Sequence, residues 1–326
     1  MQKNKNLKNY NTFGIEAFCD VFIEINNNEQ LEKIDFTNET LILGGGSNLL
    51  ITRQLKQVVF INTKGIKKIK ENDEYVILKV QAGEIWDDFV DFCVKNNYYG
   101  VENLSLIPGT VGASPIQNIG AYGTEIKDII ESVEYYNFLS QSYKNITSEK
   151  CNFAYRDSIF KNELKGKVVV TAVFFKLSKT ENYNIGYGGI KERFTNNKPT
   201  LKLVRQAIID VRDSKLPDYK LLGNSGSFFK NAIVNRSKFG ELIEKFPQMP
   251  YFTTPEGFKI PTAWLIENAG LKGFRHKNAG VYDKHSLILV NYGGATAKEI
   301  LELAQIIENT VLEKFRIKIV KEVNVI

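Results

Sequence analysis

Residues 106–123, with the sequence LIPGTVGASPIQNIGAYG, limit what this chain can fold into more than any other segment. Four glycines and two prolines fall within this segment, which we call the central loop. Proline lacks the backbone N–H that a helix interior or a central strand requires, and glycine weakens both elements. We therefore expect an ordered loop with free backbone donors, accompanied by the polar side chains of Ser114, Gln117 and Asn118.

A second glycine-rich loop, residues 44–48, reads GGGSN and follows the apolar run at residues 40–43. Its successive N–H groups have no side-chain crowding and can surround a phosphate, so this glycine loop is a candidate phosphate site. It is not the dinucleotide-binding fingerprint of a doubly wound sheet, because Leu49 replaces the third glycine. A turn without a ligand is the alternative for this loop alone. Together, the two loops suit a long ligand with a pyrophosphate and a hydrogen-bonding ring system, such as FAD.

The composition excludes several other kinds of site. The chain has two histidines and three widely spaced cysteines, and it lacks C-x-x-C, H-E-x-x-H, P-loop and G-x-S-x-G patterns. We expect no metal site. Cys19, Cys93 and Cys151 are expected to be buried, reduced thiols of a cytoplasmic protein. We expect His276 and His285 to be surface or packing residues.

Charge and hydropathy limit the partners. The chain has 43 Lys and Arg against 37 Asp and Glu, a net charge of +6, and the two signs are interspersed. This mild excess favours small anionic ligands over nucleic acid. The longest apolar run, residues 168–175, is far shorter than the ~20 residues that a membrane span needs. The N-terminus also lacks the apolar core of a signal peptide, so we expect a soluble, unexported protein.

Two segments have the apolar periodicity of a helix. Apolar residues recur at helical spacing over residues 86–94, include Cys93, and stop at a pair of asparagines. In the second segment, Thr296 and Glu299 form a capping box, and an apolar stripe continues to about Phe315. Both patterns predict helices packed on a core.

Alternating and short apolar runs predict strands. After the second helix, residues 316–326 alternate between apolar and polar side chains, which predicts a half-buried terminal strand with Glu322 on its polar face. Bounded apolar runs predict strands of mixed sheets at residues 40–43, 58–62, 75–80 and 168–177.

Two further segments carry candidate catalytic side chains. CNFAYRDSIFK contains Tyr155 and Arg156, and GNSGSFFKN contains Ser227. A surface arginine that caps or pairs, and a Gly-Ser turn before a strand, are the respective alternatives. Because no histidine lies in a triad context, we do not expect Ser227 to be a hydrolytic nucleophile.

The order and spacing of these motifs resemble the UDP-N-acetylenolpyruvoylglucosamine reductases, bacterial enzymes of peptidoglycan-precursor synthesis. The resemblance runs nearly from end to end, over LGGGSNLL, the central loop, YRDSIFK, SKLPD, GNSGSFFKN and a terminal KEV. It implies an α+β fold in which residues 1–205 form a PCMH-type FAD-binding region with subdomains at about 1–64 and 65–205. Residues 206–326 would form an α/β substrate-binding domain, whose last strand, about 316–326, returns to the active site.

The resemblance also implies ligands and catalytic roles. FAD would be the cofactor and NADPH the reductant, and the enolpyruvyl group of UDP-N-acetylglucosamine enolpyruvate would be reduced to give UDP-N-acetylmuramate. Arg156 would stabilise the enolate that forms, Ser227 would protonate C2, and Glu322 would complete the site. A solvated carboxylate on a strand face is the alternative for Glu322. The family is commonly monomeric, and we expect a cytoplasmic monomer.

Further residues are assigned to ligands by the same resemblance. FAD would be held by Gly44, Gly45, Gly46, Ser47, Asn48, Ser114, Gln117, Asn118, Gly120, Ala121, Tyr122 and Gly123. The substrate would be bound by Tyr155, Tyr187, Lys215, Asn231 and Arg275, with Lys215 and Asn231 on the UDP pyrophosphate. Tyr187 in NIGYGGI resembles the tyrosine that covers the substrate in the long form of the family; a tyrosine in a glycine-rich hairpin is the alternative.

The sequence departs from the family pattern at three positions. Ala232 stands where proline is usual, Tyr282 where histidine is common, and Arg275 at a position that varies. Two other functions stay open at this point. An oxidase of the same fold would often tether its flavin through histidine, whereas both histidines here lie outside the flavin region, so we expect non-covalent FAD. A non-catalytic nucleotide-sugar or nucleic-acid binding protein would use the loops for phosphate alone.

Overall fold

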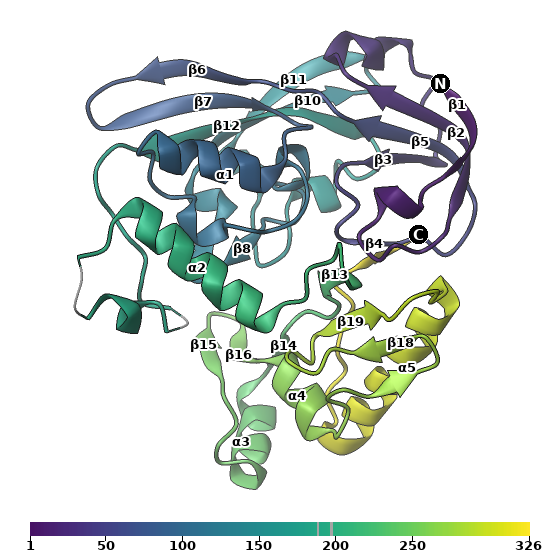
Figure 1. The fold of residues 1–326 in the computed structure, drawn as a ribbon, viewed down its shortest axis with the longest axis vertical. Coiled ribbons are helices and arrows are strands. Elements are labelled where there is room, and N and C mark those ends of the chain that lie inside the picture. Colours follow the sequence, from purple (N-terminus) through teal and green to yellow (C-terminus); the bar gives the residue numbers. More distant parts are fainter. Residues whose placement is uncertain (188, 196–197) are drawn as a thin grey trace. The chain divides into compact units, whose positions relative to one another are not determined.

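A computed structural model describes residues 1–187, 189–195 and 198–326 (Figure 1). Its contacts divide the chain into two compact units. Unit 1 comprises Met1–Lys5, Cys19–Gly45 and Leu55–Ser214. Unit 2 comprises Asn6–Phe18, Gly46–Gln54 and Lys215–Ile326.

Unit 1 contains a small, largely parallel sheet near the N-terminus. Its strand order is β1-β2-β5-β3, and β5 pairs in parallel with both β2 and β3. The strands span Gln2–Asn6 (β1), Phe18–Ile25 (β2), Thr40–Leu43 (β3) and Leu55–Ile61 (β5). The strand predicted at residues 40–43 is confirmed, and the one predicted at 58–62 begins three residues earlier because Leu55 continues the buried face.

A five-stranded antiparallel sheet forms the rest of the unit 1 core. Its order is β11-β10-β12-β7-β6, with strands at Ser142–Thr147 (β11), Ile130–Asn137 (β10), Val168–Ser178 (β12), Tyr75–Gln81 (β7) and Ile66–Glu71 (β6). Helix α1 (Trp86–Lys95) packs on this sheet, since the rings of Trp86 and Phe89 lie 5.9 Å and 4.6 Å from the ring of Phe175. The predicted helix and both predicted strands are confirmed, and Cys93 is fully buried in this core.

The central loop is an ordered connection, as predicted. It contains the 3₁₀ turn η4 (Val111–Ala113) and the two-residue strand β8 (Gly120–Ala121), which pairs with β9 (Thr124–Glu125). Helix α2 (Leu201–Lys215) ends unit 1. The other 3₁₀ turns of the described chain are Lys8–Tyr10, Asn28–Lys33, Glu102–Leu104 (η3), Ile126–Asp128, Ser148–Cys151, Ile159–Lys161 and Lys191–Phe194.

Unit 2 contains two small antiparallel sheets and three helices. The first sheet has the order β13-β19-β18-β17, and the second has the order β14-β16-β15. The strands span Gly223–Ser227 (β13), Ala232–Val234 (β14), Phe252–Thr254 (β15), Gly257–Ile260 (β16), Arg275–His276 (β17), Ala279–Val281 (β18) and Ile288–Asn291 (β19). The helices are Arg236–Lys245 (α3), Thr262–Asn268 (α4) and Ala297–Phe315 (α5).

Helix α5 supplies much of the unit 2 core. Its N-terminus has the predicted capping box, in which Thr296 and Glu299 bond each other's backbone N–H groups. The predicted apolar stripe is fully buried from Ile300 to Val311. The helix ends at Phe315, where Arg316 adopts a left-handed conformation.

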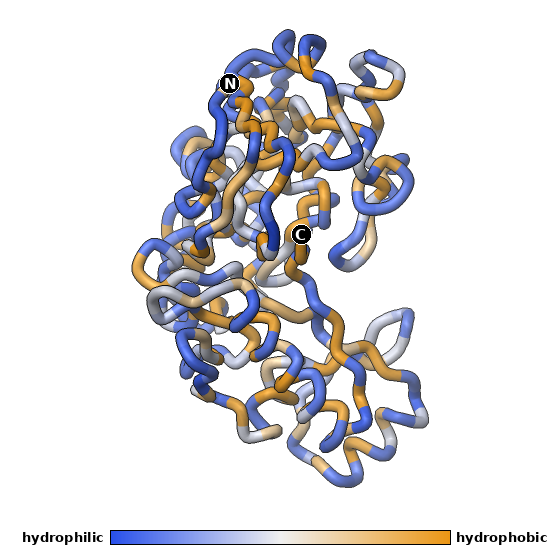
Figure 2. The backbone as a smooth tube through the Cα atoms, turned by 90° about the vertical axis from the view of Figure 1, so that its right-hand side faces the viewer, coloured by the Kyte–Doolittle hydropathy of each residue, from blue (hydrophilic) through white to orange (hydrophobic). Residues whose placement is uncertain are grey.

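The terminal strand predicted over residues 316–326 is mostly wrong. Only β20 (Asn324–Val325) is a strand, and it pairs in parallel with β4 (Leu49–Leu50). Burial still alternates around Ile317 and Ile319, and Figure 2 shows hydrophobic and hydrophilic segments alternating along the chain towards the C-terminus. Val325, however, is exposed, because its two-residue partner strand offers no face on which it could pack.

The units do not follow the expected domain limits in every detail. The expected boundary between residues 205 and 206 lies inside α2, and unit 2 takes Asn6–Phe18 and Gly46–Gln54 from the expected first subdomain. The assignment of ligands to domains stays a prediction. All three cysteines are buried and free, as expected. Among the described residues, no helix is both long and apolar enough to cross a membrane.

Loss of the α5 cap tests this local account. Replacing Thr296 by alanine removes the side-chain oxygen that accepts from Glu299 N, so we expect the free energy of unfolding to fall by about 1 kcal/mol. Thr310→Ala, on the same helix, is the control, because its hydroxyl only donates back to the carbonyl of Ile306. Urea denaturation checks both variants, and equal losses would contradict the capping role.

Candidate functional site

The first half of the glycine loop belongs to unit 1 and lies against the central loop. A Cβ added at Gly45 would lie 2.7 Å from Cα of Gly109, and one added at Gly44 would lie 2.5 Å from Oγ1 of Thr110. Real Cβ atoms do not tolerate such contacts. At Gly45 two backbones therefore approach each other directly, whereas at Gly44 the backbone lies against the Thr110 side chain. Packing explains both glycines, whose own peptide groups are not covered by a side chain.

The second half of the glycine loop belongs to unit 2. Gly46 has a φ of +62°, and a Cβ there would lie 2.0 Å from the carbonyl oxygen of Tyr10. The carbonyl of Ser47 accepts a 2.8 Å hydrogen bond from the Ser225 hydroxyl. Asn48 accepts from Asn324 N at 3.1 Å and directs its amide towards the carbonyl of Glu322 at 3.5 Å. The loop is thus fixed to the segments that carry two of the catalytic candidates.

Ser227 and Glu322 are brought together within unit 2, although they lie far apart in the sequence. Glu322 N donates to the carbonyl of Phe228, the residue after Ser227, at 2.8 Å. Phe229 and Lys321 form an antiparallel bridge, so the two segments run side by side. Phe228 is fully buried and anchors the pair, whereas both candidate side chains are only half-buried. Ser227 is the last residue of β13, rather than part of a turn before a strand.

Arg156 is held on the central loop within unit 1. Its φ is +54°, and its Nη2 donates to the carbonyl of Gly120 at 2.8 Å, with Nη1 at 3.4 Å from the carbonyl of Asn118. The guanidinium lies 5.5 Å from the ring centroid of Tyr155. Backbone carbonyls orient this cation, and a capping arginine, the alternative for this residue, would make the same bonds. The catalytic role of Arg156 stays a prediction.

Two polar side chains of the central loop make their hydrogen bonds within the protein. Asn118 is fully buried; its Nδ2 donates to Glu125 and to the carbonyl of Ala154, and its Oδ1 accepts from Lys127 N. The Ser114 hydroxyl donates to the carbonyl of Val111 at 2.6 Å. The backbone there is also bonded, since Ser114 N donates to the carbonyl of Val111, and the carbonyls of Ser114 and Asn118 accept from Ile119 N and Arg156.

Tyr187 lies in unit 1 and is connected to the end of the central loop. Its ring lies 6.3 Å from that of Tyr122 in an edge-on arrangement, and it is 44% exposed. Asn184 Nδ2 donates to the carbonyl of Gly123, and Asn103 Nδ2 donates to the carbonyls of both Tyr122 and Asn184. Burial raises the pKa of the Tyr122 hydroxyl, which is therefore neutral at physiological pH.

Three candidate substrate residues lie in unit 2. Lys215 is the last residue of α2, and its charge adds to burial in lowering the pKa of His285. Asn231 Oδ1 accepts from Thr262 N at 3.0 Å, at the start of α4. The guanidinium of Arg275 lies 4.0 Å from the ring centroid of Tyr292.

One departure from the family pattern has a structural reason. Ala232 N donates to the hydroxyl of Thr262 at 3.1 Å, a bond that the usual proline could not make. The structure gives no such explanation for Tyr282. Of the two histidines, His276 bonds Glu302 at 2.8 Å and His285 is mostly buried, which matches surface and packing roles.

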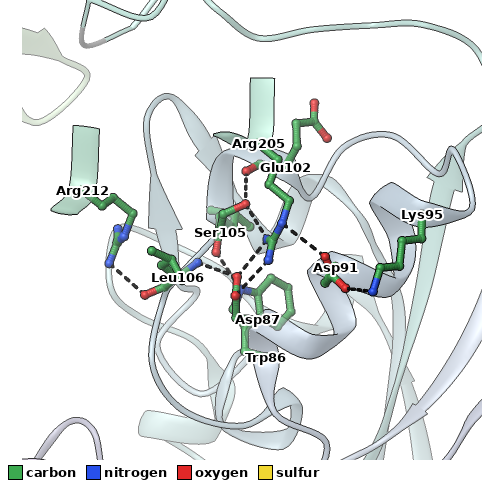
Figure 3. Close-up of polar contacts among 10 residues, drawn as sticks. Trp86, Asp87, Asp91, Lys95, Glu102, Ser105, Leu106, Arg205 and Arg212 are labelled. Carbon is green, nitrogen blue, oxygen red and sulfur yellow. Dashed lines mark hydrogen bonds and ion pairs between the residues drawn. The ribbon is translucent and has the colours of Figure 1, made fainter. Parts of the chain in front are cut away.

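A half-buried ion pair in unit 1 was not predicted from the sequence. Arg205 on α2 donates to both carboxylate oxygens of Asp87 on α1 at 2.9 Å, and also to the Ser105 hydroxyl at 2.9 Å (Figure 3). Asp87 also accepts from Leu106 N at 2.6 Å. The available signal was the seven-residue spacing of Arg205 and Arg212, which places two arginines on one face of a helix.

Arg212 reaches the same turn. It is half-buried, its Nη2 donates to the carbonyl of Leu106 at 3.2 Å, and its Nε has no hydrogen-bond acceptor among the residues that the structure describes (Figure 3). Burial lowers its pKa, yet a guanidinium stays charged at any physiological pH. A half-buried cation with an unused Nε donor beside the central loop fits an anionic, hydrogen-bonding cofactor such as FAD.

Two family models match the chain. The model described as "UDP-N-acetylenolpyruvoylglucosamine reductase, C-terminal domain" matches residues 217–326. The model described as "FAD binding domain" matches residues 35–139, a range that contains the glycine loop and the central loop. The expected FAD cofactor and the expected α+β fold class, with an FAD-binding region of the PCMH type, are confirmed.

Relatives are similar over the whole chain. The UDP-N-acetylenolpyruvoylglucosamine reductase of Flavobacterium johnsoniae is 50% identical over 335 residues, covering 100% of this chain and 99% of the relative. The enzyme of the same name from Amoebophilus asiaticus is 41% identical, and the similarity covers 100% of this chain and 99% of the relative. The crystal structure of the Thermus caldophilus enzyme of this name has a similar fold, with a TM-score of 0.66. The sequences are 22% identical, and the similarity covers 100% of this chain and 99% of that one. The chain belongs to the UDP-N-acetylenolpyruvoylglucosamine reductase family.

Proposed function

We propose that this chain reduces the enolpyruvyl group of UDP-N-acetylglucosamine enolpyruvate to give UDP-N-acetylmuramate, with non-covalent FAD as cofactor and NADPH as reductant. The structural observation that carries the proposal is the pairing of the Ser227 and Glu322 segments, which puts a hydroxyl and a carboxylate on adjacent backbones. Sequence similarity over the full length to enzymes of this name, 50% identity in one case, supports the same reaction. We further propose a cytoplasmic monomer that binds no nucleic acid.

The residues that would hold FAD are the glycine loop and the central loop. In the glycine loop, N–H groups without side-chain crowding would donate to phosphate oxygens. Arg212, which donates to the carbonyl of Leu106 in the central loop, would supply a positive charge there. When bound, FAD supplies the chemistry of accepting hydride from NADPH and delivering it to C3 of the enolpyruvyl group.

Arg156 would stabilise negative charge on the substrate. Hydride addition at C3 pushes electrons through C2 towards the carboxylate, where an enolate forms. A planar, permanently charged guanidinium can bond both carboxylate oxygens. The carbonyls of Gly120 and Asn118 hold Arg156 in one orientation, so little reorganisation would be needed as the charge develops.

Ser227 would donate the proton that C2 requires. A serine hydroxyl is a weak acid, and it can protonate only a strongly basic, carbanion-like centre. The enolate carbon is such a centre. Glu322, held beside the Ser227 segment by its own backbone N–H, would help to polarise or protonate the developing enol. No histidine is needed for any of these steps.

Several segments of the chain carry the residues proposed to bind the nucleotide sugar. Lys215 and Asn231 would bond the UDP pyrophosphate, with Lys215 as a point charge and the Asn231 Nδ2 as a donor. The Oδ1 of Asn231 is already used by Thr262, which fixes the direction of its amide group. Tyr155, Tyr187 and Arg275 would contact other parts of the substrate, with Tyr187 covering it.

An anaerobic two-step experiment tests the reaction. Purified protein is mixed with NADPH, and bleaching of the flavin absorbance is recorded; the enolpyruvyl nucleotide sugar is then added. We expect bleaching in the first step and full recovery of the absorbance in the second. A flavin that is bleached but recovers only with oxygen would indicate an oxidase, and a colourless protein would indicate a binding function alone.

Replacing Ser227 by alanine tests the role of the hydroxyl. Because Ser227 serves only the second half-reaction, we expect NADPH to bleach the flavin at the normal rate, while reoxidation by the sugar slows by about 10²- to 10⁴-fold. Glu322→Gln is expected to slow the same step. Ser237→Ala, at an exposed position of α3, is the control. Loss of both half-reactions in Ser227→Ala would instead indicate damage to the flavin site.

Replacing Gly45 by alanine tests the glycine loop. The added methyl group would collide with Cα of Gly109, so the loop must shift, and we expect FAD to bind about 10- to 100-fold more weakly. Gly240→Ala is the control, since nothing lies within 4 Å of its added Cβ. Fluorescence titration with FAD measures both. Unchanged affinity in Gly45→Ala would remove this loop from the cofactor site.

A further inference from the structure

Leu106, the first residue of the central loop, is held in an unfavourable backbone conformation. Its φ is +56°, in the left-handed region that residues with a Cβ rarely adopt. Its N–H donates to Asp87 at 2.6 Å, and its carbonyl accepts from Arg212 at 3.2 Å (Figure 3). Both sides of this residue are therefore fixed by charged side chains, one from α1 and one from α2.

Arg205 fixes the carboxylate that holds Leu106. Both of its bonds to Asp87 measure 2.9 Å, so the two side chains meet in a bidentate pair, and a third bond holds the Ser105 hydroxyl. Its side chain is 11% exposed and that of Asp87 is 24% exposed, so solvent screens the pair only weakly. A bidentate pair fixes the direction of the Asp87 carboxylate as well as its distance from Arg205. In this orientation Asp87 Oδ1 also accepts from Leu106 N.

The position of Leu106 affects the backbone that the glycine loop touches. Three residues later, Gly109 packs against Gly45, where a methyl group could not fit. The carbonyl of Gly109 accepts from Trp86 N at 3.1 Å, one residue before Asp87. The start of α1 therefore holds the turn at both ends, through Asp87 at Leu106 and through Trp86 at Gly109.

We propose that Asp87 and Arg205 are positioning residues for FAD, which hold the turn at residues 106–109 in the conformation that the glycine loop needs to bind the cofactor. Arg205 lies outside residues 35–139, the range matched by the FAD-binding family model, so α2 would add a required part to that region. This inference rests on the proposed function only in taking FAD as the ligand. It makes no use of NADPH or of the substrate.

The proposal is tested by diluting the holoenzyme and measuring the release of FAD as a rise in flavin fluorescence. We expect Arg205→Met to weaken FAD affinity by about 10- to 100-fold, since it removes a charged hydrogen-bond donor. Arg205→Lys should give an intermediate value, because a lysine supplies the charge without the fork. Arg193→Met is the matched control. Arg193 pairs at 2.9 Å with Asp210, which lies on α2 as Arg205 does, but both side chains of this pair are more than 40% exposed.

A double variant separates positioning from stability. Arg205→Met leaves the half-buried Asp87 without its cation, which by itself lowers the melting temperature, whereas Asp87→Leu/Arg205→Met removes both charges. We expect the double variant to regain most of the lost melting temperature but to keep weak FAD binding, because Leu106 N then has no acceptor. Parental FAD affinity in the double variant would overturn the proposal and leave the pair a purely structural role.

The conservative variant decides the question if the double variant does not fold. Arg205→Lys with a parental melting temperature and weaker FAD binding supports positioning, and parental values of both overturn it. The absorption spectrum of the bound flavin gives a second readout, which we expect to shift in Arg205→Lys and not in Arg193→Met. If the parent protein itself binds no FAD, the proposed function fails, and that result is distinct from failure of this inference.

Discussion

The close approach of two glycine-bearing backbones is the constraint on which unit 1 depends. At Gly45 and Gly109 no side chain fits between the loops, and a Cβ added at Gly112 would lie 2.5 Å from Cβ of Ala82, next to the large antiparallel sheet. Such a contact gains little from apolar burial, because glycine has no side chain to bury. It needs external support, which comes from polar contacts at the starts of the central loop and of α1.

This arrangement also accounts for polar side chains within the central loop. The Asn118 amide donates to the carbonyl of Ala154, and the Ser114 hydroxyl donates to the carbonyl of Val111, so both side chains help to hold the conformation of the loop. Several N–H groups of the loop are used in the same way, such as that of Gly112, which donates to the carbonyl of Ala82. The reaction itself requires little from side chains, since the flavin carries the hydride; one cation, one proton donor and one carboxylate suffice. The histidines can take structural roles, as in the pair of His276 with Glu302, a carboxyl whose pKa is lowered to about 2.

Local features of the fold were predictable from the sequence, and long-range ones were not. The apolar stripes of α1 and α5 and the cap at Thr296 depend on neighbouring residues, so periodicity located both helices. The segment after Phe315 alternates as a strand would, but a strand also needs a neighbouring strand to bond, and β4 pairs with only two residues of this segment. No periodicity reveals that partner. The recruitment of Asn6–Phe18 into unit 2 also depends on contacts that are distant in the sequence.

The same distinction applies to the site. Motifs point to Arg156, Ser227 and Glu322 as catalytic candidates because each lies in a characteristic segment, and the structure adds that the segments of the last two run side by side in unit 2. The pair of Asp87 and Arg205 joins residues 118 positions apart, so neither residue stands out by local pattern. The resemblance assigned Asn118 to the cofactor, whereas its side chain bonds only protein groups that surround it. Polar residues in a motif can thus be required for the loop rather than for the ligand.

A crystal structure of the protein with FAD tests the central claim most directly, because it reveals which groups bind the cofactor. The account predicts density for FAD within hydrogen-bonding distance of backbone N–H groups in residues 44–48 and 114–123. It also predicts that the left-handed conformation of Leu106 and its bond to Asp87 are kept. Density for FAD that contacts neither loop would contradict the account.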